Sequence, residues 1–154
     1  MKVSLLVAMR NEADFIERCL ASIFAQDYPS EKLEVLVMDG RSTDDSPRIV
    51  KRLFEDRPNC LLLDNPGITQ SAGWNLGIAR STGDVVGIVS AHCELAPDYV
   101  SKAVETLQRT GADLVGGPMR ACGPPTRRGC PKGERFPSKG RCASASAWAA
   151  SPVI

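Results

Sequence analysis

The sequence predicts an α/β fold in which helices cover both faces of a doubly wound, mostly parallel sheet. Short apolar runs of strand length alternate along residues 1–117 with segments whose apolar residues recur at helical spacing. Such alternation favours parallel strands joined by right-handed crossovers. The apolar runs are continuous, as in strands buried on both faces. Polar clusters follow two of these runs, at the sheet edge where open α/β proteins bind ligands.

The first half of the chain contains two predicted strands, each followed by a helix. The apolar run at residues 3–8 predicts the first strand. A helix is expected over residues 12–26, because apolar side chains recur there at helical spacing and Asn11 is suited to cap it. Residues 33–38 predict the second strand. Ser46 and the proline after it are typical of a cap and first helical position, and they predict the second helix.

The second half repeats this pattern with shorter strands. Residues 60–63 predict a third strand, and an Asn-Pro-Gly turn separates it from a helix over residues 69–80 that contains two glycines. A fourth strand is expected at residues 85–89. The following helix starts near Pro97 and stops at Gly111, and residues 114–115 predict a short fifth strand.

Length and composition set further limits. A chain of 154 residues is long enough for one domain with a hydrophobic core. A hydrophobic content of 43% and a net charge of +1 are ordinary for a soluble protein and point to no particular partner. No apolar stretch is long enough to span a bilayer, and the N-terminal run is too short for a signal peptide. We therefore expect a cytoplasmic protein whose six cysteines form no disulfides.

The character of the sequence changes after residue 117. Residues 1–117 carry 12 Lys and Arg against 17 Asp and Glu, whereas residues 118–154 carry 7 against 1. Residues 118–154 also hold six of the eleven prolines and show no strand or helix period. We divide the chain into an α/β domain over residues 1–117 and an irregular or disordered basic tail over residues 118–154, in which we predict no regular element.

The origin and partners of this tail can be considered from its composition. One hypothesis is a shifted reading frame, since such a shift in GC-rich DNA yields this mixture of Arg, Pro, Gly, Ala and Cys. Few aromatic residues interleave with the basic residues of the tail, so we predict no nucleic-acid partner. A solvated charged segment is the simpler interpretation.

Three stretches of the α/β domain resemble motifs of the family 2 glycosyltransferases. Residues 3–12, VSLLVAMRNE, resemble the opening strand and turn of that family. Residues 37–44, VMDGRSTD, resemble its second-strand motif, and residues 73–84 resemble the stretch before its metal-binding strand. Residues 91–99 are similar to the succinoglycan-biosynthesis variant, in which the metal motif reads Asp-Ala-His. The order and spacing of these motifs match as well, which makes the combined signal specific.

The resemblance implies a GT-A fold, whose Rossmann-like half binds a nucleotide-diphosphate sugar. A UDP-sugar is the expected donor, and a divalent metal, Mn²⁺ or Mg²⁺, is the expected cofactor. The family passes the sugar to a polysaccharide or lipid-linked acceptor, so a role in exopolysaccharide or cell-surface glycan synthesis is implied. Because such acceptors often lie at the inner membrane face, the resemblance also implies peripheral association there.

The resemblance places donor-binding residues at the strand ends and on the third helix: Ala8, Arg10, Glu12, Asp39, Ser42, Gly73, Asn75, Ser90 and Ala91. The family gives Asp39 and Glu12 contact with the base or ribose, and a carboxylate can accept hydrogen bonds from both. From its position alone, Asp39 could instead cap a loop. Arg10 either reaches a phosphate or is solvated. Gly73 either allows close approach of a backbone or ligand, or simply weakens its helix.

The resemblance places His92 at the metal position. A divalent cation offsets the charge that develops on a diphosphate leaving group, and Mn²⁺ accepts mixed oxygen and imidazole ligands. Ser90 departs from the family, which has Asp there, so weaker metal binding is expected. Glu94 either compensates for that loss or is a solvated residue before the fourth helix. We expect Asp39 and His92 to face each other across one pocket.

No catalytic base is assigned. Inverting members of the family use an Asp or Glu well after the metal motif, but the only acid after Asp113 is Glu134. The chain is therefore predicted to carry the donor half and to lack most of the acceptor half. Exposed sheet edges would then favour self-association.

Two alternative functions differ in class. One is a non-catalytic module that binds nucleotide sugars or a partner. The other, a dinucleotide-dependent oxidoreductase, is disfavoured because no glycine-rich pyrophosphate turn follows a strand.

Overall fold

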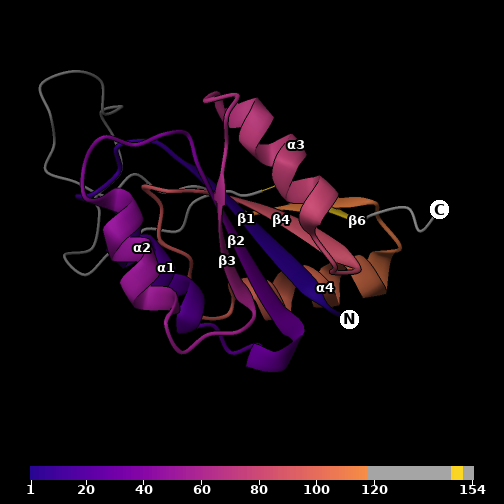
Figure 1. Cartoon of the computed structure of the whole chain (residues 1–154). Coiled ribbons are helices and arrows are strands. Elements are labelled where there is room, and N and C mark those ends of the chain that lie inside the picture. The colour runs from indigo at the N-terminus through magenta and orange to yellow at the C-terminus, as the bar shows by residue number, and fades with distance from the viewer. Residues whose placement is uncertain (118–146, 151–154) are drawn as a thin grey trace, which may run out of the picture.

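The computed structural model describes residues 1–117 and the backbone of residues 147–150. In this part of the chain a six-stranded sheet has the order β3-β2-β1-β4-β6-β5 (Figure 1). The strands are β1 Val3–Met9, β2 Leu33–Asp39, β3 Cys60–Asp64, β4 Val85–Ser90, β5 Leu114–Gly116 and β6 Ala147–Ala150. β1 pairs in parallel with β2 and β4, and β2 pairs in parallel with β3. The predicted α/β class and mostly parallel sheet are confirmed.

Helices cover both faces of the sheet. The helices are α1 Ile16–Phe24, the 3₁₀ turn η1 Ser30–Lys32, α2 Ser46–Phe54, α3 Gln70–Arg80 and α4 Tyr99–Thr110. α3 lies on one face, and α1, α2 and α4 lie on the other (Figure 1). Each of the five predicted strands is present and ends one residue later than predicted.

The core is built on β1, in which every residue is buried. Alternate side chains of a strand point to opposite faces, so β1 contributes to two clusters. Val3, Leu5 and Val7 join the larger cluster under α1 and α4, and Leu6 and Ala8 join the smaller one under α3. Each fully buried aliphatic side chain contributes about 1.5–3 kcal/mol. This two-sided burial explains why the strand reads as one unbroken apolar run.

The two glycines of α3 allow this helix to lie directly on the sheet. A Cβ at Gly73 would lie 3.1 Å from Asn65 Nδ2 and 3.2 Å from Ala8 Cβ, and one at Gly77 would lie 2.9 Å from Met38 Cε. All three contacts are tighter than side chains normally make. Gly73 is therefore explained by close packing on Asn65 and β1, whereas the tightest contact at Gly77 is with the flexible end of the Met38 side chain.

The start of the first helix differs from the prediction. α1 begins at Ile16 rather than at residue 12, and it has no side-chain cap. Before it, the backbone N–H groups of Phe15 and Ile16 both donate to the Glu12 carbonyl at 2.9 Å. Asn11 does not cap the helix, because its side-chain oxygen accepts the Thr43 N–H at 2.8 Å. The prediction failed because the Asn11 side chain, which is locally suited to cap a helix, instead bonds to the loop that contains Thr43.

The prediction that residues 118–154 contain no regular element is wrong for Ala147–Ala150. These residues form β6, which pairs antiparallel with both β4 and β5, so β5 runs in the same direction as the first four strands. Backbone hydrogen bonds can add such a segment to a sheet even where its sequence does not alternate apolar and polar residues. The rest of the expected tail lies outside the described residues.

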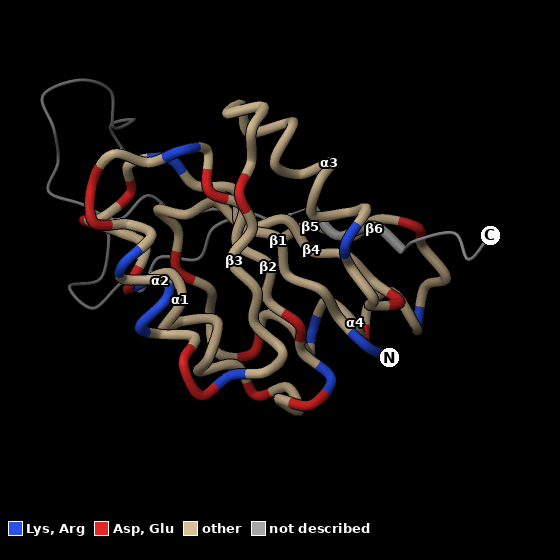
Figure 2. Tube along the Cα trace, viewed as in Figure 1, with Lys and Arg blue, Asp and Glu red and all other residues tan. Residues whose placement is uncertain are grey.

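Charged residues are almost absent from the sheet (Figure 2). Within β1 to β5 only Glu34, Asp39 and Asp64 are charged, and the last two lie at strand ends. None of the described helices has the length and apolarity needed to cross a bilayer. Cys19, Cys60 and Cys93 are free thiols.

Candidate functional site

The carboxyl ends of three strands meet at one edge of the sheet. In the strand register, Met9 lies beside Asp39, and Ala8 lies beside Ser90. The polar segments that follow β1, β2 and β4 therefore emerge next to one another, as the strand order predicts.

Unusual backbone conformations gather at this edge. In the described part of the chain, three residues other than glycine have a positive φ: Asn11 at +55°, Arg41 at +58° and Ile68 at +63°. They lie in the loops that follow β1, β2 and β3. Asparagine tolerates this region, whereas a β-branched residue such as isoleucine rarely adopts it. Strained residues often mark functional sites, so these loops are candidates for a binding role.

Hydrogen bonds lock the first two of these loops together. The Asn11 N–H donates to Ser42 Oγ at 2.9 Å, and the Glu12 N–H donates to Ser46 Oγ at 2.8 Å. Ser46 in turn donates its hydroxyl to Asp44 at 2.6 Å. Desolvation opposes ionisation of Asp44, but hydrogen bonds from Ser46 and nearby backbone lower the pKa of this carboxyl. The anionic form of Asp44 thus fastens the two loops.

Asp39 caps its own loop. Its Oδ1 accepts the Ser42 hydroxyl at 2.6 Å and the Ser42 N–H at 3.1 Å. Oδ2 has only a long contact of 3.4 Å with the same N–H, which leaves acceptor capacity on that oxygen. The capping role is therefore realised, and a role in ligand binding stays a prediction.

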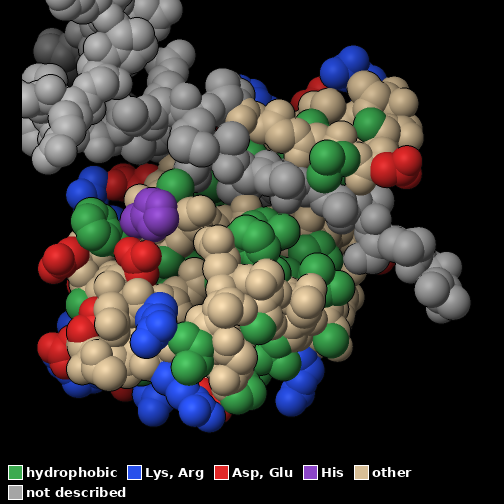
Figure 3. Space-filling view, turned by 90° about the horizontal axis from the view of Figure 1, so that it is seen from above, with side chains coloured by type: hydrophobic (Ala, Val, Ile, Leu, Met, Phe, Trp, Pro, Cys, Tyr) green, Lys and Arg blue, Asp and Glu red, His purple; other side chains and the backbone are tan. Residues whose placement is uncertain are grey.

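His92 lies against Glu12. Its Nδ1 is 3.4 Å from Glu12 Oε1, and 58% of the His92 side chain is exposed, against 23% for Glu12. Figure 3 shows the single histidine of the chain beside an acidic side chain on the face seen from above. Glu94 forms an ion pair with Arg18 and so is not a lone solvated carboxylate.

A small cavity of about 170 Å³ opens at this edge. It is lined by Ala8, Met9, Arg10, Glu12, Asn65, Ile68, Thr69 and Gln70. Three of the predicted donor-binding residues, Ala8, Arg10 and Glu12, thus share one cavity. Asp39 and His92 reach the same edge of the sheet, but neither lines this cavity.

The other predicted donor-binding residues do not line the cavity. Gly73 packs on the sheet, and Asn75 is exposed on α3. Ala91 is buried in the core, and the Ser90 carbonyl accepts the Cys93 N–H at 3.0 Å. Their roles in donor binding stay predictions. Asn65, Ile68 and Thr69 were missed, because an Asn-Pro-Gly turn signals a loop without signalling its function.

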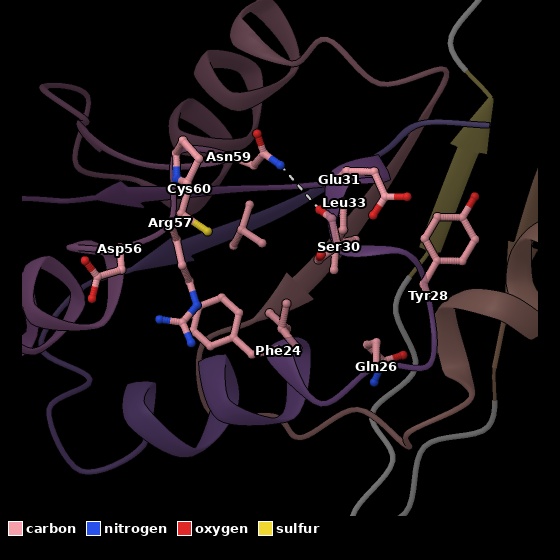
Figure 4. Close-up of a pocket in the computed structure, with 13 residues that line it drawn as sticks. Phe24, Gln26, Tyr28, Ser30, Glu31, Leu33, Asp56, Arg57, Asn59 and Cys60 are labelled. Atoms are coloured by element: carbon pink, nitrogen blue, oxygen red, sulfur yellow. Dashed lines mark hydrogen bonds between the residues drawn. The ribbon is translucent and has the colours of Figure 1, made fainter.

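A larger cavity of about 740 Å³ lies at the opposite edge (Figure 4). It is lined by the first residues of β2 and β3, Leu33 and Cys60, and by Phe24 at the end of α1. Arg57 stacks over the Phe24 ring at 4.1 Å and donates to the Leu53 carbonyl at 2.7 Å. The smaller cavity is the better candidate site, because it alone adjoins the strained loops and the strand ends.

The described residues offer too few ligands to hold a metal ion by themselves. They fit better a cation that is also bound by the phosphates of a nucleotide. Among them, no three His, Cys, Asp or Glu side chains are placed to hold a metal ion. Glu12 and His92 offer one oxygen and one nitrogen ligand. A hard divalent cation bound to phosphates often needs only one or two protein ligands.

A mostly parallel open sheet with interlocked polar loops at its carboxyl edge defines an α/β domain of the class that binds ligands at that edge. Comparison with known proteins narrows this class. The model of the family "Glycosyl transferase family 2" matches residues 4–142. The chain therefore belongs to glycosyl transferase family 2, as its motifs predicted.

Relatives and solved structures agree with this assignment. The chain is 33% identical over 116 residues to glycosyltransferase AglE of Haloferax volcanii, which covers 75% of this chain and 38% of that protein. It is 33% identical over 121 residues to the succinoglycan biosynthesis protein ExoA of Rhizobium meliloti, covering 77% of this chain and 36% of that protein. The chain thus spans well under half the length of these relatives.

Two solved structures share the fold. The mannosyltransferase PcManGT of Pyrobaculum calidifontis, in complex with GDP-Man and Mn²⁺, superposes with a TM-score of 0.72 at 33% identity, covering 77% of this chain and 36% of that one. TarS of S. aureus, in complex with UDP, superposes with a TM-score of 0.72 over 86% of this chain and 38% of that one. At 24% identity, the second likeness supports the fold alone.

Proposed function

We propose that this chain carries the donor-binding part of a glycosyltransferase that transfers a sugar from a nucleotide-diphosphate donor. The observation that carries the proposal is the cavity at the carboxyl edge, where Ala8, Arg10 and Glu12 converge between interlocked loops. A UDP-sugar is the proposed donor. The sugar goes to a polysaccharide or lipid-linked acceptor in the synthesis of exopolysaccharide or cell-surface glycan.

Each residue of the edge has a proposed role in binding the donor. Asp39 Oδ2 accepts a hydrogen bond from the base or ribose, since Oδ1 is already occupied by Ser42. Arg10 lines the cavity at this edge and offers a cation to the diphosphate. His92 and Glu12 hold the divalent cation, Mn²⁺ or Mg²⁺, which when bound offsets charge on the departing diphosphate.

Partners and location follow from the family and belong to the proposal. One relative, from Methanococcus voltae and 34% identical over 109 residues, is named as a dolichyl-phosphate sugar glucuronosyltransferase, whose acceptor is lipid-linked. We place the present protein in the cytoplasm, with peripheral association at the inner membrane face. Residues 1–117 are proposed to form the donor-binding domain, and residues 118–154 a basic segment whose strand β6 joins the sheet of that domain.

Calorimetry of UDP binding, with and without Mn²⁺, tests the donor site. The wild-type chain is expected to bind UDP more tightly when Mn²⁺ is present. GDP, which carries a different nucleobase, is measured for comparison. His92→Ala is expected to remove most of the gain from Mn²⁺ while metal-free UDP binding persists. Glu17→Gln is the matched control, because this carboxylate is paired with Arg52 and belongs to α1.

Two results of this experiment would contradict the proposal. Failure of the wild-type chain to bind any nucleoside diphosphate in the presence of Mn²⁺ would exclude a donor site. Tight Mn²⁺ binding that survives His92→Ala would exclude the cation assignment alone.

A second candidate function is a binding module without turnover. The observation that favours it is Ser90, because the family has an aspartate at this position and a neutral hydroxyl offsets no cation charge. An assay for UDP release from a UDP-sugar separates the two functions. Binding without release supports the module, and release supports the transferase.

A further inference from the structure

Ile68 adopts a backbone conformation that its side chain disfavours. Its φ is +63°, in the left-handed region that glycine and asparagine populate most readily. Two carbon branches at Cβ make this conformation especially crowded for isoleucine. A residue of this type persists there only where the surrounding structure imposes the geometry.

Hydrogen bonds and a close backbone contact impose the conformation. The Ile68 N–H donates to the Asn65 carbonyl at 3.0 Å, and the Thr69 N–H donates to the Gly67 carbonyl at 2.6 Å. The buried Asn65 side chain donates to the Thr69 carbonyl at 3.0 Å. On the other side, a Cβ at Gly40 would lie 2.6 Å from the Ile68 carbonyl oxygen. The loop after β3 is thus fixed against the loop after β2.

This conformation presents an apolar side chain at the cavity. Ile68 is 36% exposed and lines the cavity together with Arg10 and Glu12. Of the other apolar residues in the lining, Met9 is buried in the core and Ala8 is small. Ile68 is therefore the large apolar surface that this polar cavity offers to a ligand.

A nucleobase is the part of a nucleotide sugar that best matches such a surface. Its flat face is apolar and its edge carries hydrogen-bonding groups, whereas the sugar rings carry hydroxyl groups around their rims and the diphosphate is charged. The loop of Ile68 joins that of Asp39, because the Asn65 N–H donates to the Asp39 carbonyl at 2.9 Å. An apolar wall and a carboxylate oxygen with spare acceptor capacity therefore belong to neighbouring loops, as recognition of a base face and a base edge requires.

We propose that Ile68 is a specificity-determining residue whose strained backbone holds its side chain against the face of the donor nucleobase. This inference rests on the proposed function. It assigns to Ile68 a contact that a nucleoside diphosphate makes and that inorganic pyrophosphate, which has no base, cannot make.

Binding of UDP and of inorganic pyrophosphate, each measured by calorimetry with Mn²⁺, tests the inference. Ile68→Gly is expected to weaken UDP binding about fivefold to tenfold, because the apolar contact is lost. Pyrophosphate has no base, so its affinity is expected to stay within twofold of the wild type. The Tm of Ile68→Gly is expected not to fall, since glycine relieves the disfavoured φ and offsets the lost packing.

Two further variants sharpen the test. Ile68→Val keeps an apolar wall and is expected to retain UDP affinity close to that of the wild type. Ile78→Ala removes a more exposed isoleucine, 50% against 36% for Ile68, that lies on α3 and does not line the cavity, and it should change neither affinity.

The outcomes separate the two proposals. Unchanged UDP affinity in Ile68→Gly, or an equal loss for UDP and pyrophosphate, overturns the role of Ile68 and leaves the donor site standing. Absence of UDP binding in the wild type overturns the proposed function and this inference with it. A loss of UDP affinity without a loss of pyrophosphate affinity in Ile68→Gly, together with unchanged UDP affinity in Ile68→Val, supports the inference.

Discussion

At the scale of single residues, Glu34 shows how a carboxylate is accommodated inside a strand. Only 7% of Glu34 is exposed, yet it accepts hydrogen bonds from the Ser4 hydroxyl and from the Thr82 N–H and hydroxyl at 2.9 and 2.8 Å. Burial opposes ionisation, but the hydrogen bonds from Ser4 and Thr82 outweigh it and lower the pKa of Glu34. The anion therefore ties β1, β2 and the turn before β4 together.

The stability of the domain is predicted to depend on this carboxylate. Because its folded-state pKa lies below its unfolded value, Glu34 stabilises the fold above that unfolded value, and the contribution disappears as pH falls through the folded-state pKa. Glu34→Gln is expected to cost about 2 kcal/mol at pH 7. Urea unfolding between pH 3 and pH 7 checks this. Glu31→Gln, at an exposed position, is the control.

A parallel dependence on pH in both chains would contradict the prediction. The difference between wild type and Glu34→Gln should shrink toward acid, since both then carry a neutral side chain. If the two unfolding free energies still differ at low pH, the shape of the side chain rather than its charge accounts for the loss of stability in Glu34→Gln.

At the scale of elements, two glycines at the ends of helices are required for different reasons. Gly83, in the turn after α3, has no room for a side chain, because a Cβ would lie 2.7 Å from the Ser4 backbone nitrogen. Gly111, at the end of α4, has open space around it but a φ of +65°. The first position is limited by a neighbouring strand, and the second by its own backbone.

Alanine substitutions are expected to separate these two causes. Gly83→Ala should cost about 3 kcal/mol through crowding against backbone that cannot move aside. Gly111→Ala should cost about 1 kcal/mol, the usual penalty for the left-handed conformation. Thermal and urea unfolding of both variants measures the costs. Equal losses would show that crowding at Gly83 is relieved by a small shift of β1.

The same scale shows how far the sequence predicts the structure. Strands such as β1 and helices such as α4 were predictable, because their apolar patterns reflect local burial. The left-handed φ of Ile68 was not, because it is imposed by hydrogen bonds and contacts between loops distant in sequence. Within the site, Arg10 and Glu12 could be placed from motifs, whereas the contact of Glu12 with His92 needed the fold.

At the scale of the whole molecule, apolar side chains remain exposed at both edges of the described sheet. Leu114 of the edge strand β5 is 60% exposed, and Leu61 of the opposite edge strand β3 is 45% exposed. Unprotected edges of this kind favour pairing between copies.

Self-association is therefore predicted to grow with concentration, as sedimentation velocity can measure. Leu114→Lys is expected to reduce it, because an edge charge opposes strand pairing. Ile78→Lys, on a helix surface away from the edges, is the control. A wild-type chain that stays monomeric at high concentration would count against the prediction.

The position of β6 also bears on the order in which the molecule can assemble. β5 and β4 are close in sequence, but the strand that joins them comes from residues 147–150. During synthesis on the ribosome, β1 to β4 can pair as soon as they emerge, whereas β5 must wait until the last of these residues has left the exit tunnel. The β5 edge is thus the last part of the described sheet to close, and a nascent chain would expose it longer than β1 to β4 to chaperones and proteases.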